Sequence, residues 1–139
     1  MKSQFSVVLV DDDDDTREVF REFLSYKGIN VLGTGKNGKE GFELFRNFQP
    51  DVVLLDVMMP DYDGFYALSH IKKENPDAKV VMVTADKTIT TENRLNELGA
   101  TYILYKPYEI DEVIRIIQQV HKNSISGSEK NTIHFVPNI

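Results

Sequence analysis

The stretch VVLVDDDDDT, residues 7–16, consists of four apolar residues, five consecutive aspartates and a threonine. A short run rich in Val and Leu predicts a buried β-strand, and the polar run after it marks the carboxyl end of that strand. Neighbouring carboxylates about 4 Å apart repel each other by roughly 1 kcal/mol in water and by about 4 kcal/mol at an effective dielectric of 20. A helix N-terminus offsets about 0.3–1 kcal/mol per acid, whereas a divalent cation reverses the local field. The stretch alone leaves open a solvated acidic turn and a metal site.

The rest of the sequence repeats this pattern, because short runs rich in Val, Ile and Leu alternate with longer segments of helical period. Such alternation is typical of βα units that build a parallel sheet, so we predict an α/β fold. The first, third and fourth runs are almost entirely apolar, as expected for central strands that are covered on both faces. The predicted strands are residues 7–10, 29–32, 52–55, 80–83 and 102–104.

The predicted helices carry apolar side chains at helical spacing, and we assign these stripes to the core. They comprise Val19, Phe20, Phe23 and Leu24; Phe42, Phe45 and Phe48; Phe65, Leu68 and Ile71; and Ile110, Val113, Ile114, Ile117 and Val120. The fourth helix, residues 88–98, has only Ile89, Leu95 and Leu98 as large apolar side chains, and Gly99 marks its end. A helix with so little apolar surface is a candidate moving part.

Length and composition restrict the classes of protein. The 139 residues, 41% of them apolar and 27% charged, fit one globular domain, which we place at residues 1–122. Residues 123–139 are read as a polar tail or the start of a linker. The sequence contains no cysteine, which excludes disulfides, thiolate metal sites and thiol catalysis.

Charge and histidine placement narrow the partners. The formal net charge of −6 disfavours direct contact with nucleic acid, because phosphate binding needs a basic face. His70, His121 and His134 match no metal-ligand spacing and are read as surface or helix-face residues. The sequence shows no signal peptide and no apolar run of membrane-spanning length, so we expect a cytoplasmic protein without membrane contact.

Reactive side chains follow four of the five predicted strands. In an open parallel α/β sheet, ligands bind outside the carboxyl ends of the strands, so these side chains are expected to meet at one edge. Carboxylates suit Mg²⁺, and a hydroxyl and an ammonium facing the metal suit a phosphoryl group. The cluster contains no histidine, which points to an aspartate as the phosphoryl acceptor. The residues are Asp11 and Asp12, Asp56, Thr84 with Ala85, and Lys106 with Pro107.

Four motifs in these positions resemble the response regulator receiver domain of two-component signalling. They are VVLVDD, LLDVMMPDYDG, VVMVTA and LGATYILYKPY, and they occur in the family's order within residues 5–122. The resemblance implies a flavodoxin-like, doubly wound (βα)5 fold with a five-stranded parallel sheet in the order 2-1-3-4-5 and helices on both faces. It implies a phosphoacceptor signalling domain that takes part in its own phosphorylation and dephosphorylation, not an enzyme.

The resemblance also assigns the metal and the acceptor. Asp56 would take a phosphoryl group from a phosphohistidine of a sensor histidine kinase or phosphotransfer protein, or from a small acyl phosphate. Asp12 would bind Mg²⁺ directly and Asp11 through water, with Asp56 and the backbone carbonyl of Met58 completing the set. Mg²⁺ is the only cofactor implied.

The remaining assignments concern the bound phosphoryl group. Thr84 would donate a hydrogen bond to it, Lys106 would form an ion pair with it, and Pro107 matches a family proline that is often cis. Ala85 belongs to the same pocket, and the loop that shapes it contains Met59, Pro60 and Gly64.

One position departs from the family pattern. The family's switch uses an aromatic residue three positions before the lysine, and this sequence has Ile103 there, between Tyr102 and Tyr105. We expect Thr84 to move toward the phosphate while the fourth helix and fifth strand repack around Ile103 without an aromatic swing. The expected recipient of the signal is a downstream effector protein or an output domain.

The sequence also allows three alternatives. Asp12, Asp14 and Thr16 satisfy D-x-D-x-T, which is similar to the nucleophile motif of Mg²⁺-dependent haloacid-dehalogenase-type phosphatases, with Asp12 as nucleophile. A G-x-G-x-x-G pattern, with Asp56 as a ribose acid, is a second alternative, although turn glycines before a helix explain it better. Its glycines are Gly33, Gly35 and Gly38. Third, the chain is either a free-standing receiver, which we favour, or the N-terminal part of a longer regulator.

The five aspartates of the opening stretch then take different roles. Asp11 and Asp12 are expected to hold the metal, and Asp13 is expected to be merely exposed. We predict that Asp14 or Asp15 caps the first helix, with a capping box between Asp15 and Glu18.

Overall fold

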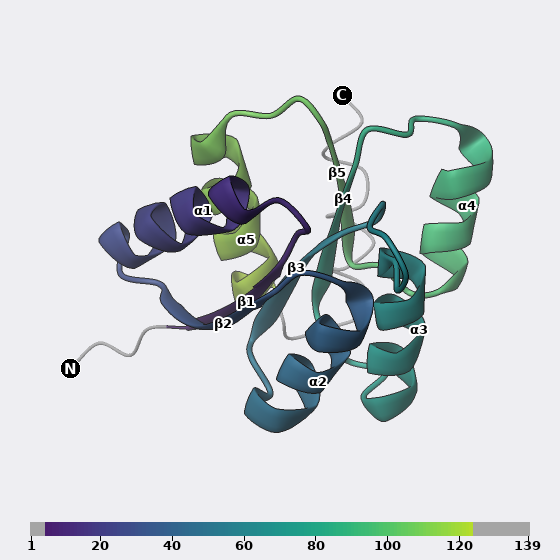
Figure 1. Cartoon of the computed structure of the whole chain (residues 1–139), viewed down its shortest axis with the longest axis horizontal. Coiled ribbons are helices and arrows are strands. Elements are labelled where there is room, and N and C mark those ends of the chain that lie inside the picture. Colours follow the sequence, from purple (N-terminus) through teal and green to yellow (C-terminus); the bar gives the residue numbers. More distant parts are fainter. Residues whose placement is uncertain (1–4, 124–139) are drawn as a thin grey trace.

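The structure is a computed structural model that describes residues 5–123. Its strands form one parallel sheet in the order β2-β1-β3-β4-β5, which confirms the predicted flavodoxin-like fold (Figure 1). The strands are β1 (Ser6–Val10), β2 (Asn30–Gly35), β3 (Val52–Asp56), β4 (Val80–Thr84) and β5 (Tyr102–Tyr105). Within the described part of the chain, no helix is long and apolar enough to cross a membrane.

The helices cover both faces of the sheet, as Figure 1 shows. One face carries α1 (Asp14–Tyr26) and α5 (Ile110–Lys122), whose apolar side chains pack on β1, β3, β4 and β5. The other face carries α2 (Gly38–Phe48), α3 (Gly64–Glu74) and α4 (Ile89–Glu97). The strand order runs outward from β1 to β2 on one side and from β3 to β4 and β5 on the other. The order therefore reverses between β1 and β3, and ligands bind at the carboxyl ends of the strands at such a reversal.

Strand β2 is longer than predicted. It runs through Gly33 and Gly35, two glycines that the sequence pattern favours as part of the turn before α2. A Cβ at Gly33 would lie 2.9 Å from the Leu44 side chain, and one at Gly35 would lie 3.1 Å from Cβ of Glu40. Both glycines therefore let α2 pack closely on an edge strand, so the interpretation of turn glycines is wrong for these two.

The assignment of apolar stripes to the core is correct for α5 and wrong in part for α1 and α2. In α5, Val113, Ile114, Ile117 and Val120 are all buried. Exposed fractions are 47% for Val19, 41% for Phe23 and 49% for Phe48. In α1 only Phe20 and Leu24, one turn apart, face the sheet. These helices bury a narrower stripe than the apolar pattern suggests.

The N-terminus of α1 is capped by Asp13, not by Asp14 or Asp15. Asp13 has an extended backbone, and its Oδ2 accepts hydrogen bonds from the Thr16 amide at 2.9 Å and the Thr16 hydroxyl at 2.6 Å. The helix begins at Asp14, so the residue before it occupies the capping position. These bonds lower the pKa of Asp13. The prediction that Asp13 is merely exposed is wrong.

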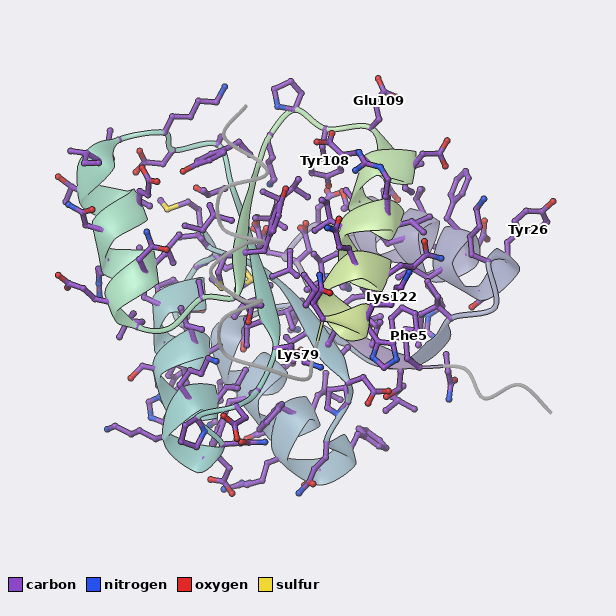
Figure 2. All side chains as sticks on the ribbon, turned by 180° about the vertical axis from the view of Figure 1, so that it is seen from behind. Phe5, Tyr26, Lys79, Tyr108, Glu109 and Lys122 are labelled. Carbon is purple, nitrogen blue, oxygen red and sulfur yellow. The ribbon has the colours of Figure 1, made fainter. Side chains whose placement is uncertain are left out.

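The end of α4 and the positions of His70 and His121 on helices agree with the predictions made from the sequence. Gly99 follows the C-cap residue Leu98 with a φ of 96°, which confirms it as the stop signal. His70 stacks on Tyr66 along α3, and His121 stacks on Phe5 at a centroid distance of 4.3 Å. Phe5 and the end of α5 lie together in Figure 2. His134 and the predicted tail lie outside the described residues, apart from Asn123.

Two glycines hold the loop between β3 and α3 close to its neighbours. A Cβ at Gly64 would overlap the backbone oxygen of Asp56, and a Cβ at Gly38 would overlap the backbone oxygen of Asp63. The Gly38 amide also donates to the Tyr62 carbonyl at 2.6 Å. The start of α2 is thereby packed directly against the loop that follows β3.

Candidate metal centre

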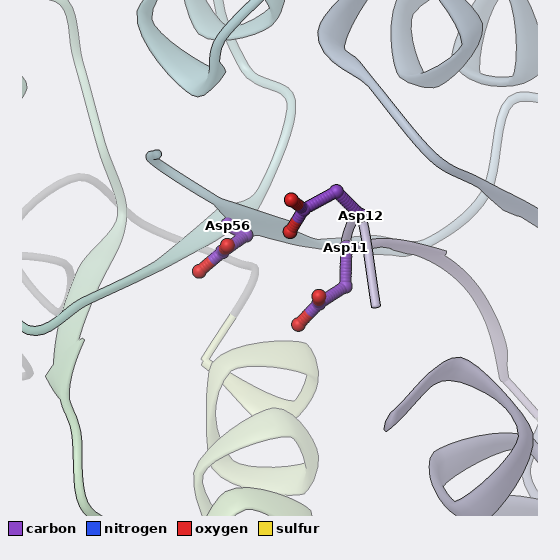
Figure 3. Close-up of side chains that lie close together, drawn as sticks. All are labelled: Asp11, Asp12 and Asp56. Atoms are coloured by element: carbon purple, nitrogen blue, oxygen red, sulfur yellow. The ribbon is translucent and has the colours of Figure 1, made fainter. Parts of the chain in front are cut away.

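Three carboxylates lie together at the carboxyl ends of β1 and β3 (Figure 3). Each of Asp11, Asp12 and Asp56 offers an oxygen within 4.8 Å of the other two. Asp56 is the last residue of β3 and is 4% exposed, Asp11 is half-buried and Asp12 is exposed. The structure therefore brings together all three predicted metal carboxylates.

The donors fit a hard cation. All three side chains supply carboxylate oxygens, which Mg²⁺ prefers over nitrogen and sulfur, and the exposure of Asp12 leaves room for water ligands. Met58 lies in the loop after β3 with its side chain 66% exposed. Its backbone carbonyl as a further ligand stays a prediction.

Lys106 completes the cluster from the neighbouring side. Its Nζ lies 3.1 Å from Oδ1 of Asp56, and its amide donates to the Thr84 carbonyl at 2.9 Å. Pro107 follows in a cis peptide, as the resemblance implied. The ion pair confirms the prediction that Lys106, which follows β5, reaches the carboxylates at the ends of β1 and β3.

Burial governs the charges of the cluster. Burial, followed by the negative charge of Asp11, raises the pKa of Asp56 to about 6, although Lys106 acts in the opposite direction. Burial likewise raises the pKa of Asp11, against the hydrogen bond from the Asp13 amide and the charge of Lys106. Burial alone would lower the pKa of Lys106, but the attraction of Asp56 and Asp11 outweighs it and raises that pKa. A cation between the carboxylates would relieve this repulsion.

Thr84 ends β4 and is 1% exposed. Its hydroxyl accepts a hydrogen bond of 3.0 Å from the Asp86 amide. The Asp86 carboxylate in turn accepts from the Thr88 amide at 2.9 Å and from the Thr91 hydroxyl at 2.7 Å, and these bonds lower its pKa. A short chain of hydrogen bonds thus runs from Thr84 to the first turn of α4.

The other predicted pocket residues lie near this edge in different environments. Ala85 is exposed directly after Thr84. Ile103 is 7% exposed and belongs to the apolar cluster beneath α2, α3 and α4. Its role in switching stays a prediction.

Sequence reasoning missed Arg17 and Tyr108. Both line a small cavity together with Asp11 and Asp56. Tyr108 packs on Phe20 at a centroid distance of 5.8 Å. Arg17 donates a hydrogen bond of 2.7 Å to the carbonyl of Asp11 and forms an ion pair with Asp14. The spacing of Asp14 and Arg17, three residues apart on a helix, was the available signal for that pair.

The rival motifs find no support in this geometry. In the D-x-D-x-T pattern, Asp14 pairs with Arg17 and has an 87% exposed side chain, and Thr16 donates to Asp13. Of the three glycines in the other pattern, two lie inside β2.

Comparison with known proteins gives consistent matches. A model of the response regulator receiver domain family matches residues 7–118. The chain is 33% identical over 131 residues to the Probable C4-dicarboxylate response regulator DctR of Bacillus subtilis, covering 92% of this chain and 58% of DctR. It is 28% identical over 116 residues to the chemotaxis protein CheY of Thermotoga maritima, covering 84% of this chain and 97% of CheY.

A solved structure gives a similar result. A chain in the crystal structure of the CheX-CheY-BeF3-Mg²⁺ complex from Borrelia burgdorferi superposes with a TM-score of 0.78 at 28% identity, covering 84% of this chain and 88% of that one. The present chain spans a little more than half the length of the DctR proteins that it matches.

Proposed function

Because the chain belongs to the response regulator receiver domain family of two-component systems, we propose that its Asp56 accepts a phosphoryl group in a Mg²⁺-dependent reaction. The donor would be a phosphohistidine of a sensor histidine kinase or phosphotransfer protein, or a small acyl phosphate. The observation that carries the proposal is the position of Asp56, buried at the end of β3, with Lys106 at 3.1 Å and two further carboxylates beside it.

The chemistry assigns a role to each side chain. A carboxylate oxygen of Asp56 would form the new P–O bond as the P–N bond to the donor breaks and its electron pair returns to the imidazole. The Lys106 ammonium would then pair with a phosphoryl oxygen in place of Asp56, to which it is bonded in this structure. The Thr84 hydroxyl would donate to a second phosphoryl oxygen while still accepting from the Asp86 amide.

Asp11, Asp12 and Asp56, with the Met58 carbonyl, would hold the Mg²⁺. When bound, the ion supplies positive charge that offsets the charges of the carboxylates and the phosphoryl group. The relative from Borrelia burgdorferi was crystallised in a complex containing BeF3 and Mg²⁺, which supports this choice of ion.

We propose further that the signal leaves through α4 and β5. The hydrogen bonds from Thr84 through Asp86 to Thr88 and Thr91 supply a connection between the acceptor pocket and α4. Repacking around Ile103 would complete the change without an aromatic swing. Structures with and without a phosphate mimic test this proposal, and an unchanged α4 and β5 would contradict it.

The domain bounds, the cellular location and the downstream partner are also part of the proposal. Residues 1–122 would form the receiver, acting in the cytoplasm on an effector protein or on an output domain that lies outside this chain. Response regulators interact with kinases and with downstream effectors, and the longer DctR relatives agree with either arrangement.

Incubation with acetyl phosphate and Mg²⁺, followed by mass measurement, tests phosphorylation. We expect wild type to gain one phosphoryl group and Asp56→Asn to gain none. Asp61→Asn is a matched control, because Asp61 is an exposed aspartate of the following loop with a φ of 70°, a conformation that asparagine also adopts. Labelling at Asp12 in peptide mapping would instead support the phosphatase alternative.

A further inference from the structure

Arg17 lies near the start of α1 and contacts the acidic end of β1 through Asp11. Its side chain is only 18% exposed, and Nη1 donates a hydrogen bond of 2.7 Å to the backbone carbonyl of Asp11. Its Nη2 forms an ion pair with the carboxylate of Asp14. The guanidinium therefore joins the strand end to the helix start.

These bonds complete the restraint of Asp11. The Asp11 amide donates to the Gly35 carbonyl at 3.0 Å, and Oδ1 of Asp11 accepts from the Asp13 amide at 2.9 Å. Arg17 takes the remaining backbone group, the carbonyl. Asp11 is thus held at its amide, its carbonyl and its carboxylate, and the peptide bond that leads to Asp12 is fixed by Arg17.

We propose that Arg17 is a positioning residue of the metal pocket, which keeps Asp11 and Asp12 directed at Asp56 before a metal binds. The inference rests on the proposed function, since it assumes that these carboxylates bind Mg²⁺. Arg17 bonds the backbone of Asp11 and not the carboxylates themselves, so its contribution is geometric. A planar guanidinium that bonds two groups at once suits this task, whereas a lysine presents a single ammonium.

Geometry and charge predict opposite results, which makes the proposal testable. If Arg17 acted only as a positive charge near the carboxylates, its removal would strengthen Mg²⁺ binding, because like charges repel. If it positions the ligands, its removal weakens binding, and groups that orient metal ligands typically contribute 10–100-fold in affinity. Arg17→Lys keeps the charge and loses the two-pronged bonding, so it isolates the geometric effect.

The experiment measures the dissociation constant of Mg²⁺ alone by titration of backbone amide NMR signals, together with melting temperatures. We expect Arg17→Lys and Arg17→Gln to weaken Mg²⁺ binding about 10-fold and the Asp13 amide signal to shift in the metal-free protein. The matched controls are Arg21→Lys and Arg21→Gln, which change an exposed arginine one turn further along α1 and should leave the constant within about twofold.

Two outcomes would overturn the proposal. One is a wild-type constant in Arg17→Lys with only a lower melting temperature, which would make the residue structural. The other is tighter Mg²⁺ binding in Arg17→Gln, which would make it a counter-charge. Failure of wild type itself to bind Mg²⁺ would overturn the proposed function as well, so the two failures are distinguishable.

A variant at Asp14 tests the proposal even if the Arg17 variants do not fold. Asp14 has an 87% exposed side chain, so Asp14→Asn removes the ion pair that orients the guanidinium without disturbing the core. We expect it to weaken Mg²⁺ binding about threefold, less than the Arg17 changes because the bond to Asp11 remains. Equal affinity in Asp14→Asn, Arg17→Lys and wild type contradicts the positioning role.

Discussion

The two sides of Asp56 are built differently. On the β1 side, the backbone and side chain of Asp11 are restrained by Gly35, Asp13 and Arg17, and α1 follows at once. On the β4 side, α4 has a single buried residue, Leu95, and its first turn is attached through Asp86. The two metal carboxylates that β1 contributes, Asp11 and Asp12, therefore lie on the restrained side, whereas α4, the helix expected to move, is held by less buried apolar surface.

A matched pair of core substitutions gives the largest expected effect. Leu24 in α1 and Leu95 in α4 are both 0% exposed. We expect Leu24→Ala to lower the free energy of unfolding by about 3–5 kcal/mol. The cavity would form in the core beneath α1, and we expect α1 to unfold only together with the rest of the domain. We expect Leu95→Ala to cost about 1–3 kcal/mol, since local melting of α4 limits the loss.

Denaturant unfolding and hydrogen exchange check this pair. In Leu95→Ala, the amides of α4 should lose protection while those of β1 and α1 keep it. If both substitutions lowered the free energy of unfolding equally and all amides lost protection from exchange to the same extent, the β1 side and the β4 side of Asp56 would not differ in local stability.

The charge of Asp56 gives the next effect. Its pKa is raised to about 6 in the folded state from an ordinary value of 3.8, so the folded protein holds this proton more tightly. Stability from this group is therefore present below about pH 4 and is lost as pH rises through 6, by about 3 kcal/mol in total.

Asp56→Asn should remove this loss. Without Mg²⁺ at pH 7.5, it should be more stable than wild type by about 2–3 kcal/mol, with a flatter pH profile between pH 4 and 7. Urea unfolding at several pH values measures the difference, and Asp61→Asn serves again as the control. A variant less stable than wild type at pH 7.5 would contradict the raised pKa of Asp56, which comes first from burial and then from the charge of Asp11.

Binding of Mg²⁺ to the carboxylates on the β1 side should stabilise the folded protein. At about 100 times its dissociation constant, the ion would add about 2.7 kcal/mol to wild type. We expect Asp12→Ala to abolish this gain and Asp15→Ala, an exposed neighbour in the same acidic run, to retain it. Thermal melting with and without Mg²⁺ gives the answer, and an intact gain in Asp12→Ala would disprove the metal assignment.

The smallest effect concerns the N-cap of α4. The Thr88 hydroxyl accepts from the Thr91 amide at 3.4 Å, a long bond. Thr88→Ala should therefore cost about 0.5 kcal/mol, at the low end for N-caps, and should increase exchange only within α4. Spread of faster exchange to β1 would show that the two sides are more tightly coupled than their contacts suggest.

The juxtaposition of the side chains in the candidate metal centre could be predicted from the sequence because topology decides it. Residues that follow parallel strands must meet at one edge, so Asp11, Asp56 and Lys106 were found from strand ends alone. The cap of α1 was missed because it depends on the residue at which the helix starts, and the acidic run offers several equivalent candidates. Arg17 was missed because its bond to the Asp11 carbonyl joins a side chain to a backbone group, which residue types do not reveal.

The exposed apolar residues were missed for a related reason. Periodicity shows which side of a helix is apolar, but the neighbouring elements determine how wide a stripe is covered. Phe23 belongs to the predicted stripe of α1 and is 41% exposed, and Tyr26, at the end of the same helix, projects away from it (Figure 2).

The close packing at Gly38 and Gly64 sets a limit on how this protein can vary. At both positions an added methyl group would collide with main-chain oxygen, which cannot rotate away as a side chain can. In a saturation mutagenesis library selected for phosphorylation, every replacement at these two positions should disappear. The acidic run, in which Asp15 makes no contact that the pocket requires, should in contrast accept many residues. Tolerance to change in this chain is therefore decided by main-chain proximity as much as by chemistry.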